Sequence, residues 1–249
     1  MNILQHVNVE SIYPLNSADK QLMPKRMAWA TPDTRYAIQK LAQRVKNAGG
    51  NLRLSDLFRS YADQKAANLK QPKLSPPPGR SNHEAGRAFD IDLDAINMSL
   101  EQFWKLASVF GVTPIIASPD SRANEAWHFE CLGSHITLRK LGARYVAMSG
   151  ILDLGLPVDE FPGEKRRAAH MQCMLHRINQ DPGAIDGIIG PKTNAALAKA
   201  TEGYEDYPID PYYLLQGLCF DWFPNEFGWA ANYQGNGTLQ ETIKHHTVS

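Results

Sequence analysis

The sequence predicts an α+β fold, with a small antiparallel sheet and flanking helices, followed by a small all-α domain at the C-terminus. Three observations support this prediction. Within the first 150 residues, short stretches of alternating apolar and polar residues lie between helical patterns. A segment rich in Gly and Pro follows residue 150. Beyond it, apolar residues recur at helical spacing. We therefore expect two domains, residues 1–150 and residues 151–249.

The first elements have clear start and stop signals. Thr31 and Pro32 predict a helix with Thr31 as N-cap and proline at the first helical position. An apolar stripe continues to Gly49 and Gly50, which end the helix. Leu52 and the residues after it alternate in polarity, so a short strand is expected next.

Two more helices are indicated by capping patterns. Ser60 and Asp63 have capping-box spacing, so a second helix should begin near Ser60. Arg59 then lies just before a helix N-terminus, where the partial positive charge already favours anions. The segment Ser99 to Gln102 is a further capping box and predicts a third helix.

The stretch from Ser81 to Asp92 carries the most specific chemistry. His83 and Asp90 stand seven positions apart, with Gly86 between them. Ala88 to Leu93 alternates in polarity and predicts a half-buried strand. Because glycine permits a tight approach of the backbone, His83 can fold back toward Asp90.

Downstream, Glu125 and His128 add a second imidazole and a further carboxylate. Two imidazoles, one metal-competent carboxylate and one spare carboxylate are the components of a catalytic zinc site. Such a site has three protein ligands, an open position for water and a base beside it. The small sheet with its flanking helices is therefore expected to hold zinc.

Two alternatives compete with the zinc site. Four acidic residues occupy positions 1, 3, 5 and 12 of a calcium-loop pattern: Asp90, Asp92, Asp94 and Glu101. Position 6 of that pattern should be glycine but is Ala95, and the capping box places Glu101 in a helix. The other alternative is a surface histidine among solvated acids.

Two separated motifs carry a family resemblance. Ser81-x-His83-x-x-Gly86-x-Ala88-x-Asp90, followed by Glu125-x-Trp127-His128, resembles the zinc D-Ala-D-Ala carboxypeptidase family. That family includes the vancomycin-resistance D,D-carboxypeptidases and several phage endolysins. The resemblance covers roughly the first 150 residues. It implies zinc bound by His83, Asp90 and His128, with Glu125 as the catalytic base.

The same resemblance implies the substrate contacts. Arg59 matches the arginine of a Tyr-Arg-Ser segment that the family places ahead of its zinc motif, with Phe58 in place of tyrosine. It is expected to orient the substrate or to stabilise the developing oxyanion. Gln64 and Ser81 are the other expected substrate-binding residues. The segment 55–57 departs from the serine-glycine commonly found there.

The C-terminal half carries a second resemblance. Asp186-Gly187-Ile188-Ile189-Gly190-Pro191-Lys192-Thr193, between two helical stretches, resembles the small helical peptidoglycan-binding domain. An ordinary helical hairpin is the alternative. Residues 203–249 are rich in aromatic side chains, which either stack on sugars or pack against the neighbouring helices.

Composition sets limits on partners and compartment. Lys and Arg together number 26, as do Asp and Glu, so the formal net charge is zero. This balance argues against nucleic-acid binding. The three cysteines are far apart and do not predict a disulfide framework. No signal peptide of the usual form and no membrane span is visible, so export by phage lysis or by a dedicated secretion system is expected.

The sequence thus predicts a zinc metallopeptidase of peptidoglycan, a D-alanyl-D-alanine carboxypeptidase acting on stem peptides. Its expected partners are stem peptides and the cell wall, and a monomer is expected. A cell-wall endopeptidase, either an endolysin or a secreted effector, is the alternative among enzymes. A zinc-stabilised wall-binding protein is the alternative that is not an enzyme.

Overall fold

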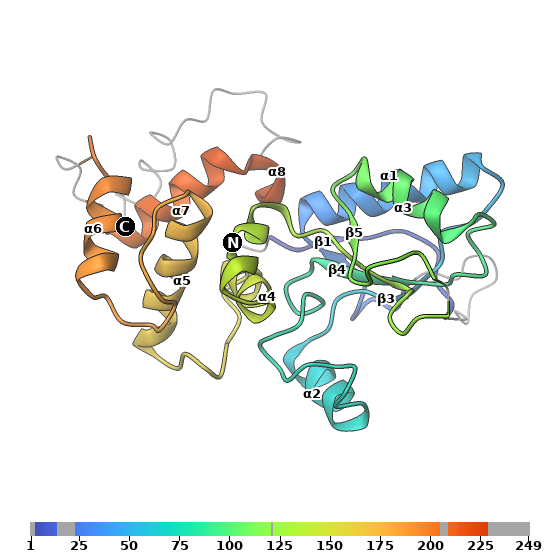
Figure 1. The fold of residues 1–249 in the computed structure, drawn as a ribbon, viewed down its shortest axis with the longest axis horizontal. Coiled ribbons are helices and arrows are strands. Elements are labelled where there is room, and N and C mark those ends of the chain that lie inside the picture. Colours follow the sequence, from blue (N-terminus) through green and yellow to red (C-terminus); the bar gives the residue numbers. More distant parts are fainter. Residues whose placement is uncertain (1–2, 14–22, 121, 205–208, 229–249) are drawn as a thin grey trace. The chain divides into compact units, whose positions relative to one another are not determined.

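The computed structural model describes residues 3–13, 23–120, 122–204 and 209–228. The chain divides into two compact units, Met1–Gly133 and Ser134–Ser249 (Figure 1). The boundary expected near residue 150 falls inside a helix of the second unit, α4 (Ala143–Asp153).

The first unit is built on a small antiparallel sheet, as the sequence predicted. Its four strands have the order β3-β4-β6-β5. They are β3 (Leu54–Asp56), β4 (Ala88–Ile91), β6 (His128–Glu130) and β5 (Thr113–Pro114). Proline ends β5 at the edge of the sheet, where its missing N–H breaks no ladder. A second antiparallel pair is formed by β1 (Gln5–His6) and β2 (Trp29–Ala30).

The helices of the first unit begin where the capping residues predict. They are α1 (Pro32–Asn47), α2 (Tyr61–Lys70) and α3 (Leu100–Ser108). Ser60 and Ser99 each accept a hydrogen bond from the third helical N–H and complete a capping box. Such a cap stabilises a helix by typically about 1 kcal/mol.

The apolar core lies on one face of the sheet. Figure 1 shows α1 and α3 side by side over this face, and their apolar stripes join a single buried cluster with the strands. Phe103 of α3 meets Phe129 of β6 edge to face at 4.9 Å, and Phe89 of β4 stacks on Phe129. Each such side chain stabilises the fold by about 1.5–3 kcal/mol through burial. Because side chains alternate along a strand, Asp90 and His128 must face the other side.

A β-bulge in β3 changes which side chains face the core. Leu54 pairs with Ile91 whereas Asp56 pairs with Asp90, so one extra residue is inserted between them. Without the bulge, Leu54 and Asp56 would point to the same face. With it, Leu54 is fully buried in the core and Asp56 turns to the face that carries Asp90.

The described part of the second unit contains helices and a 3-10 segment, η1 (Gly133–Leu141). Its other helices are α5 (Glu164–Arg177), α6 (Pro191–Ala200), α7 (Pro211–Trp222) and α8 (Pro224–Phe227). Helices α5 and α6 lie on either side of the turn at Asp186 and Gly187, as expected. The side-chain oxygen of Gln172 in α5 accepts hydrogen bonds from the Asp186 and Gly187 N–H groups and so holds this segment.

Helix α4 is an element that the sequence did not reveal. Residues 146–152 are buried one after another, so the helix shows no apolar stripe that contrasts with a polar face. Gly150 also lies within it, at the start of a segment whose composition suggests a linker. The connection to α5 therefore begins after Asp153 rather than at Gly150.

The aromatic residues near the C-terminus are used mainly for packing where they are described. Tyr212, Phe223 and Phe227 are partly buried against the apolar cluster formed by α5, α6 and α7. Trp222 is an exception, because 56% of it is exposed. Tyr207 and residues 229–249, which belong to the predicted aromatic tail, lie outside the described residues.

A buried ion network crosses the second unit. Arg177 is fully buried and donates to Asp153 Oδ2 at 2.6 Å and to Glu226 Oε2 at 2.8 Å. His170 Nε2 lies 2.8 Å from Asp153 Oδ1. The Arg177 guanidinium holds the pKa of Asp153 well below its usual range, although burial alone would raise it. The network thus balances buried carboxylates with a buried cation.

All three cysteines are buried thiols, and burial raises the pKa values of Cys173 and Cys219 to about 12. Among the described residues, no helix has both the length and the apolar character needed to cross a membrane.

Candidate metal centre

Three buried side chains from the first unit bring their donor atoms together. His83 Nε2 lies 3.4 Å from Asp90 Oδ1 and 3.3 Å from His128 Nδ1. Asp90 Oδ1 lies 2.8 Å from His128 Nδ1. A tetrahedral zinc centre with ligand distances of about 2.0–2.1 Å has edges of about 3.3 Å. The donor types and their spacing therefore fit one zinc ion.

Local structure explains why these residues meet. Asp90 and His128 are direct partners across the β4–β6 ladder, so their side chains share one face of the sheet. His83 lies in the turn that leads into β4. Gly86 ends this turn at φ +65°, and a Cβ at that position would come within 2.6 Å of Leu4 Cδ2. The positive φ favours glycine here, because Leu4 could move aside for a Cβ but the backbone conformation would stay strained, and the turn returns His83 to Asp90 as the sequence predicted.

Each imidazole is oriented through its second nitrogen. His83 Nδ1 lies 2.5 Å from the Leu57 carbonyl oxygen, which leaves Nε2 for a metal. His128 Nε2 lies 3.7 Å from Glu130 Oε1, which leaves Nδ1 on the inner side. Glu130 is itself held by a 2.6 Å hydrogen bond from Asn82 Nδ2. Such outer contacts fix the tautomer and ring direction of metal-binding histidines.

The electrostatics of the cluster favour a cation beside its carboxylates. Burial raises the pKa of Asp90, but His83 and His128 lower it more, to well below its usual range. Burial lowers the pKa of His128, but Asp90 and Glu130 together raise it to about 10. Both shifts reflect the strong attraction between a buried carboxylate and a cation placed beside it.

Glu125 lies in the turn before β6, at the edge of the cluster. Its backbone has φ +67°, which is uncommon for a residue with a side chain, and its carbonyl accepts a hydrogen bond from the His128 N–H. Burial raises the pKa of the Glu125 carboxyl, and its electrostatic neighbours include His128, Asp90 and Arg59. The structure therefore brings this predicted base close to the three predicted ligands.

Arg59, which directly precedes the N-cap Ser60 of α2, reaches the same cluster. Its Nη2 lies 3.8 Å from Asp90 Oδ2. Asp56 Oδ2 accepts from Nε at 2.7 Å and lies 2.6 Å from Nη2, and Gln64 Oε1 accepts from Nη1 at 3.2 Å. The guanidinium is thus held on two sides before any substrate arrives.

The two other expected substrate contacts are engaged within the protein. Gln64 is fully buried and donates to Ser75 Oγ at 2.9 Å and to the Pro76 carbonyl at 2.7 Å. Ser81 is also buried, and its Oγ accepts a hydrogen bond from the His83 N–H. Gln64 therefore supports Arg59, and Ser81 supports His83. A direct substrate contact by either residue stays a prediction.

Sequence reasoning missed two residues of this site. In the sequence, Asp56 is only part of the segment 55–57 that departs from the family pattern, although an acid three residues before Arg59 is typical of an ion pair. Tyr13 lies in an N-terminal stretch without any pattern. Its hydroxyl donates to the Ser55 carbonyl at 2.9 Å, and its pKa is raised by burial and then by the nearby Asp56.

The calcium-loop alternative does not fit the structure. Glu101 lies in the first turn of α3, is exposed, and pairs with Lys105 at 2.9 Å. Asp92 pairs with Arg53 at 3.2 Å. Asp90 Oδ1 faces the ring nitrogens of His83 and His128. The acidic residues of the pattern therefore do not converge on one ion.

No family model and no curated protein sequence matches the chain. Among solved structures, one similar chain is the LdcB LD-carboxypeptidase, whose structure concerns peptidoglycan recognition. The TM-score is 0.40 at 19% identity, over 63% of this chain and 75% of that one. Another is the vancomycin resistance D,D-dipeptidase VanXYg in complex with a D-Ala-D-Ala phosphinate analogue. Here the TM-score is 0.35 at 23% identity, over 55% of this chain and 66% of that one. Both TM-scores are below 0.5.

Proposed function

We propose that the first unit is a zinc-dependent peptidase that hydrolyses the terminal peptide bond of peptidoglycan stem peptides ending in D-Ala-D-Ala. One observation carries the proposal. His83, Asp90 and His128 converge with donor spacings that suit zinc, and a carboxyl group and a guanidinium lie at the edge of the cluster. The resemblance of the two sequence motifs to zinc D-Ala-D-Ala carboxypeptidases supports the choice of substrate.

The positions of the metal ligands and of Glu125 suggest a role for each in the reaction. Zinc, when bound by His83, Asp90 and His128, supplies Lewis-acid polarisation of the scissile carbonyl and a more acidic water. Glu125 takes the proton from the attacking water and then delivers it to the leaving amine. The partial burial that raises the pKa of its carboxyl favours this second role.

Arg59 binds and orients the substrate. Three of its five N–H groups are directed at Asp56 and Gln64, so two remain for a ligand. Paired N–H groups suit a carboxylate, and the rigid mounting means that little conformational entropy is lost on binding. When Arg59 binds the terminal carboxylate, the last peptide bond of the stem lies at the metal centre.

The test compares three substrates of the zinc-loaded full chain by mass spectrometry: an acyl-D-Ala-D-Ala peptide, its C-terminal amide, and a stem peptide with an internal bond. The proposal expects the free acid to be cut at least about tenfold faster than the amide, which loses the paired ionic contact. If the amide or the internal bond is cut equally fast, the endopeptidase alternative replaces it. If zinc binds and no peptide is cut, the wall-binding alternative replaces it.

We also propose that the second unit attaches the enzyme to the cell wall. The Asp186 to Thr193 segment, which resembles a peptidoglycan-binding domain, supports this role. Within it, Ile188 and Ile189 are 58% and 40% exposed, an apolar pair next to a turn that is held by Gln172. Attachment raises the local concentration of substrate at the first unit.

A further inference from the structure

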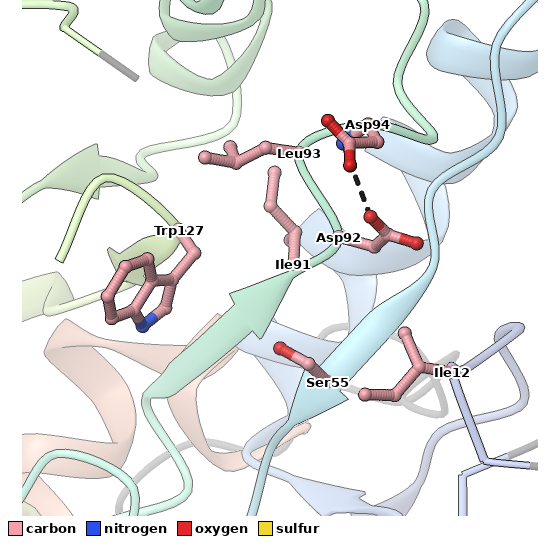
Figure 2. Close-up of a pocket in the computed structure, with 7 residues that line it drawn as sticks. All are labelled: Ile12, Ser55, Ile91, Asp92, Leu93, Asp94 and Trp127. Carbon is pink, nitrogen blue, oxygen red and sulfur yellow. Dashed lines mark hydrogen bonds between the residues drawn. The ribbon is translucent and has the colours of Figure 1, made fainter. Parts of the chain in front are cut away.

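The edge of the sheet at β3 is covered by residues 10–13, which run parallel to the strand. The Leu54 N–H donates to the Glu10 carbonyl at 2.8 Å, and the Ile12 N–H donates to the Leu54 carbonyl at 3.0 Å. Ile12 and Ser55 both line the pocket drawn in Figure 2, which shows them on these two neighbouring segments. Residues 10–13 therefore hold β3 from the side opposite to β4.

Tyr13, at the end of this segment, reaches the β-bulge in β3. Ser55 is the residue inserted between Leu54 and Asp56 in the pairing with β4. The extra residue of a bulge disrupts the ladder locally, so its polar groups need partners elsewhere. The Tyr13 hydroxyl donates to the Ser55 carbonyl at 2.9 Å. Burial, and then the nearby Asp56, raise the pKa of this hydroxyl, so it stays protonated as a donor at neutral pH.

The bulge is connected to the metal centre through Asp56. The Ser55 carbonyl belongs to the planar peptide group that joins Ser55 to Asp56, so a hydrogen bond to this carbonyl also fixes the backbone of Asp56. Asp56 Oδ2 accepts from Arg59 Nε at 2.7 Å, and Arg59 Nη2 lies 3.8 Å from Asp90 Oδ2. An unbroken series of contacts thus leads from Tyr13 to a predicted metal ligand.

We propose that Tyr13 is a positioning residue, whose hydroxyl holds the bulge in the conformation in which Asp56 directs Arg59 toward the metal centre. This role rests on the proposed function, in which Arg59 binds the terminal carboxylate of the substrate. Tyr13 acts through Asp56 and Arg59 and does not itself contact the substrate. Removal of its hydroxyl should therefore affect only substrates that carry the terminal carboxylate.

The first measurement follows Arg59 itself, by NMR of the full chain. Its Nε–H donates to Asp56, so exchange of this proton with solvent requires the hydrogen bond to open. The signal is assigned as the one that is lost in Arg59→Lys. In Tyr13→Phe, which removes only the hydroxyl, exchange should be about 3- to 10-fold faster, the range for the loss of one neutral hydrogen bond. Tyr36→Phe is the matched control, because Tyr36 is exposed on α1, and it should leave this exchange unchanged.

The second measurement compares hydrolysis of an acyl-D-Ala-D-Ala peptide and its C-terminal amide by the zinc-loaded full chain. Tyr13→Phe should lower kcat/KM for the free acid by about 3- to 10-fold and change kcat/KM for the amide by less than about twofold. A general loss of structure would slow the hydrolysis of both substrates alike. Since Tyr13 acts through Arg59, the Tyr13→Phe/Arg59→Ala double variant should be no slower than Arg59→Ala alone.

The positioning role is overturned if exchange of the Arg59 Nε–H is unchanged in Tyr13→Phe. An equal loss of kcat/KM for both substrates, or a further loss in the double variant, would overturn it as well. The proposed function is judged separately, on the wild type. If the wild type cuts neither peptide, or cuts the amide as fast as the free acid, the proposed function is wrong. Faster exchange of the Arg59 Nε–H in Tyr13→Phe would then still support the positioning role.

Discussion

Asp56 holds the Arg59 guanidinium through a single carboxylate oxygen, which lies 2.7 Å from Nε and 2.6 Å from Nη2. The bulge in β3 makes this possible, because it turns Asp56 away from the core and onto the face of Asp90. The other Asp56 oxygen accepts the Leu57 N–H at 2.8 Å, so the carboxylate is itself fixed. The backbone of the strand thereby determines where Arg59 points.

Replacing Asp56 by Ala should lower kcat/KM for an acyl-D-Ala-D-Ala peptide by about 10- to 100-fold, because a small misplacement of an orienting group is costly. Zinc content should not change. Since Asp56 acts through Arg59, the Asp56→Ala/Arg59→Ala double variant should be no slower than Arg59→Ala alone. A further loss in the double variant would show that Asp56 has a role of its own in the reaction.

Replacing Glu125 by Gln should retain zinc and lower kcat by about 10²- to 10⁴-fold, the usual range for a general base. The amide keeps the shape and hydrogen bonding of the carboxyl but cannot accept the proton. Metal analysis and steady-state kinetics on the same preparation check this prediction. Turnover at the wild-type rate would remove Glu125 from the mechanism.

One zinc ion per chain is expected, with ligand distances of about 2.0–2.2 Å. Replacing His83 by Ala should lower the zinc content and activity of the full chain together. His6→Ala is a matched control, because His6 lies in β1, outside the cluster. Elemental analysis after dialysis provides the measurement, and unchanged zinc content in His83→Ala would contradict the ligand set.

Replacing Arg177 by Met should destabilise the second unit by about 3–5 kcal/mol, because Asp153 and Glu226 would keep their buried charges without the cation between them. Urea denaturation measures the change in free energy of unfolding. Arg144→Met is the control. Arg144 is partly exposed and pairs with Glu160 at 3.5 Å, so its loss should cost less than about 1 kcal/mol.

Replacing Ile188 and Ile189 by Ser should weaken binding of the full chain to purified cell walls by at least about fivefold, since each exposed isoleucine offers apolar area to a partner. The denaturation midpoint should stay the same. Leu69→Ser, on exposed α2 of the first unit, is the control and should bind walls like the wild type. Equal wall binding by all three proteins would contradict this role for the segment.

The elements that could be predicted from the sequence are those with local causes. The start of α1 at Pro32 follows from a cap and a proline, and the starts of α2 and α3 follow from capping boxes. The side chains that could bind a metal could also be predicted, because most of them are neighbours in the sequence. His83, Gly86 and Asp90 belong to one short turn and strand, and His128 stands at the start of the next strand in the ladder.

Other features were decided only by tertiary structure, because they depend on residues far apart in the chain. In the pairing of β3 with β4, one inserted residue between Leu54 and Asp56 turns Asp56 to the face of Asp90. The polarity pattern of the sequence does not reveal this inserted residue. The carbonyl of Leu57 orients His83 across 26 positions, and Asn82 holds Glu130 across 48. Helix α4 is buried along most of its length, so its sequence has no amphipathic stripe from which the helix could be predicted. Local sequence determined which groups are able to bind a metal, whereas strand register and long-range hydrogen bonds determined which of them are aimed at one point.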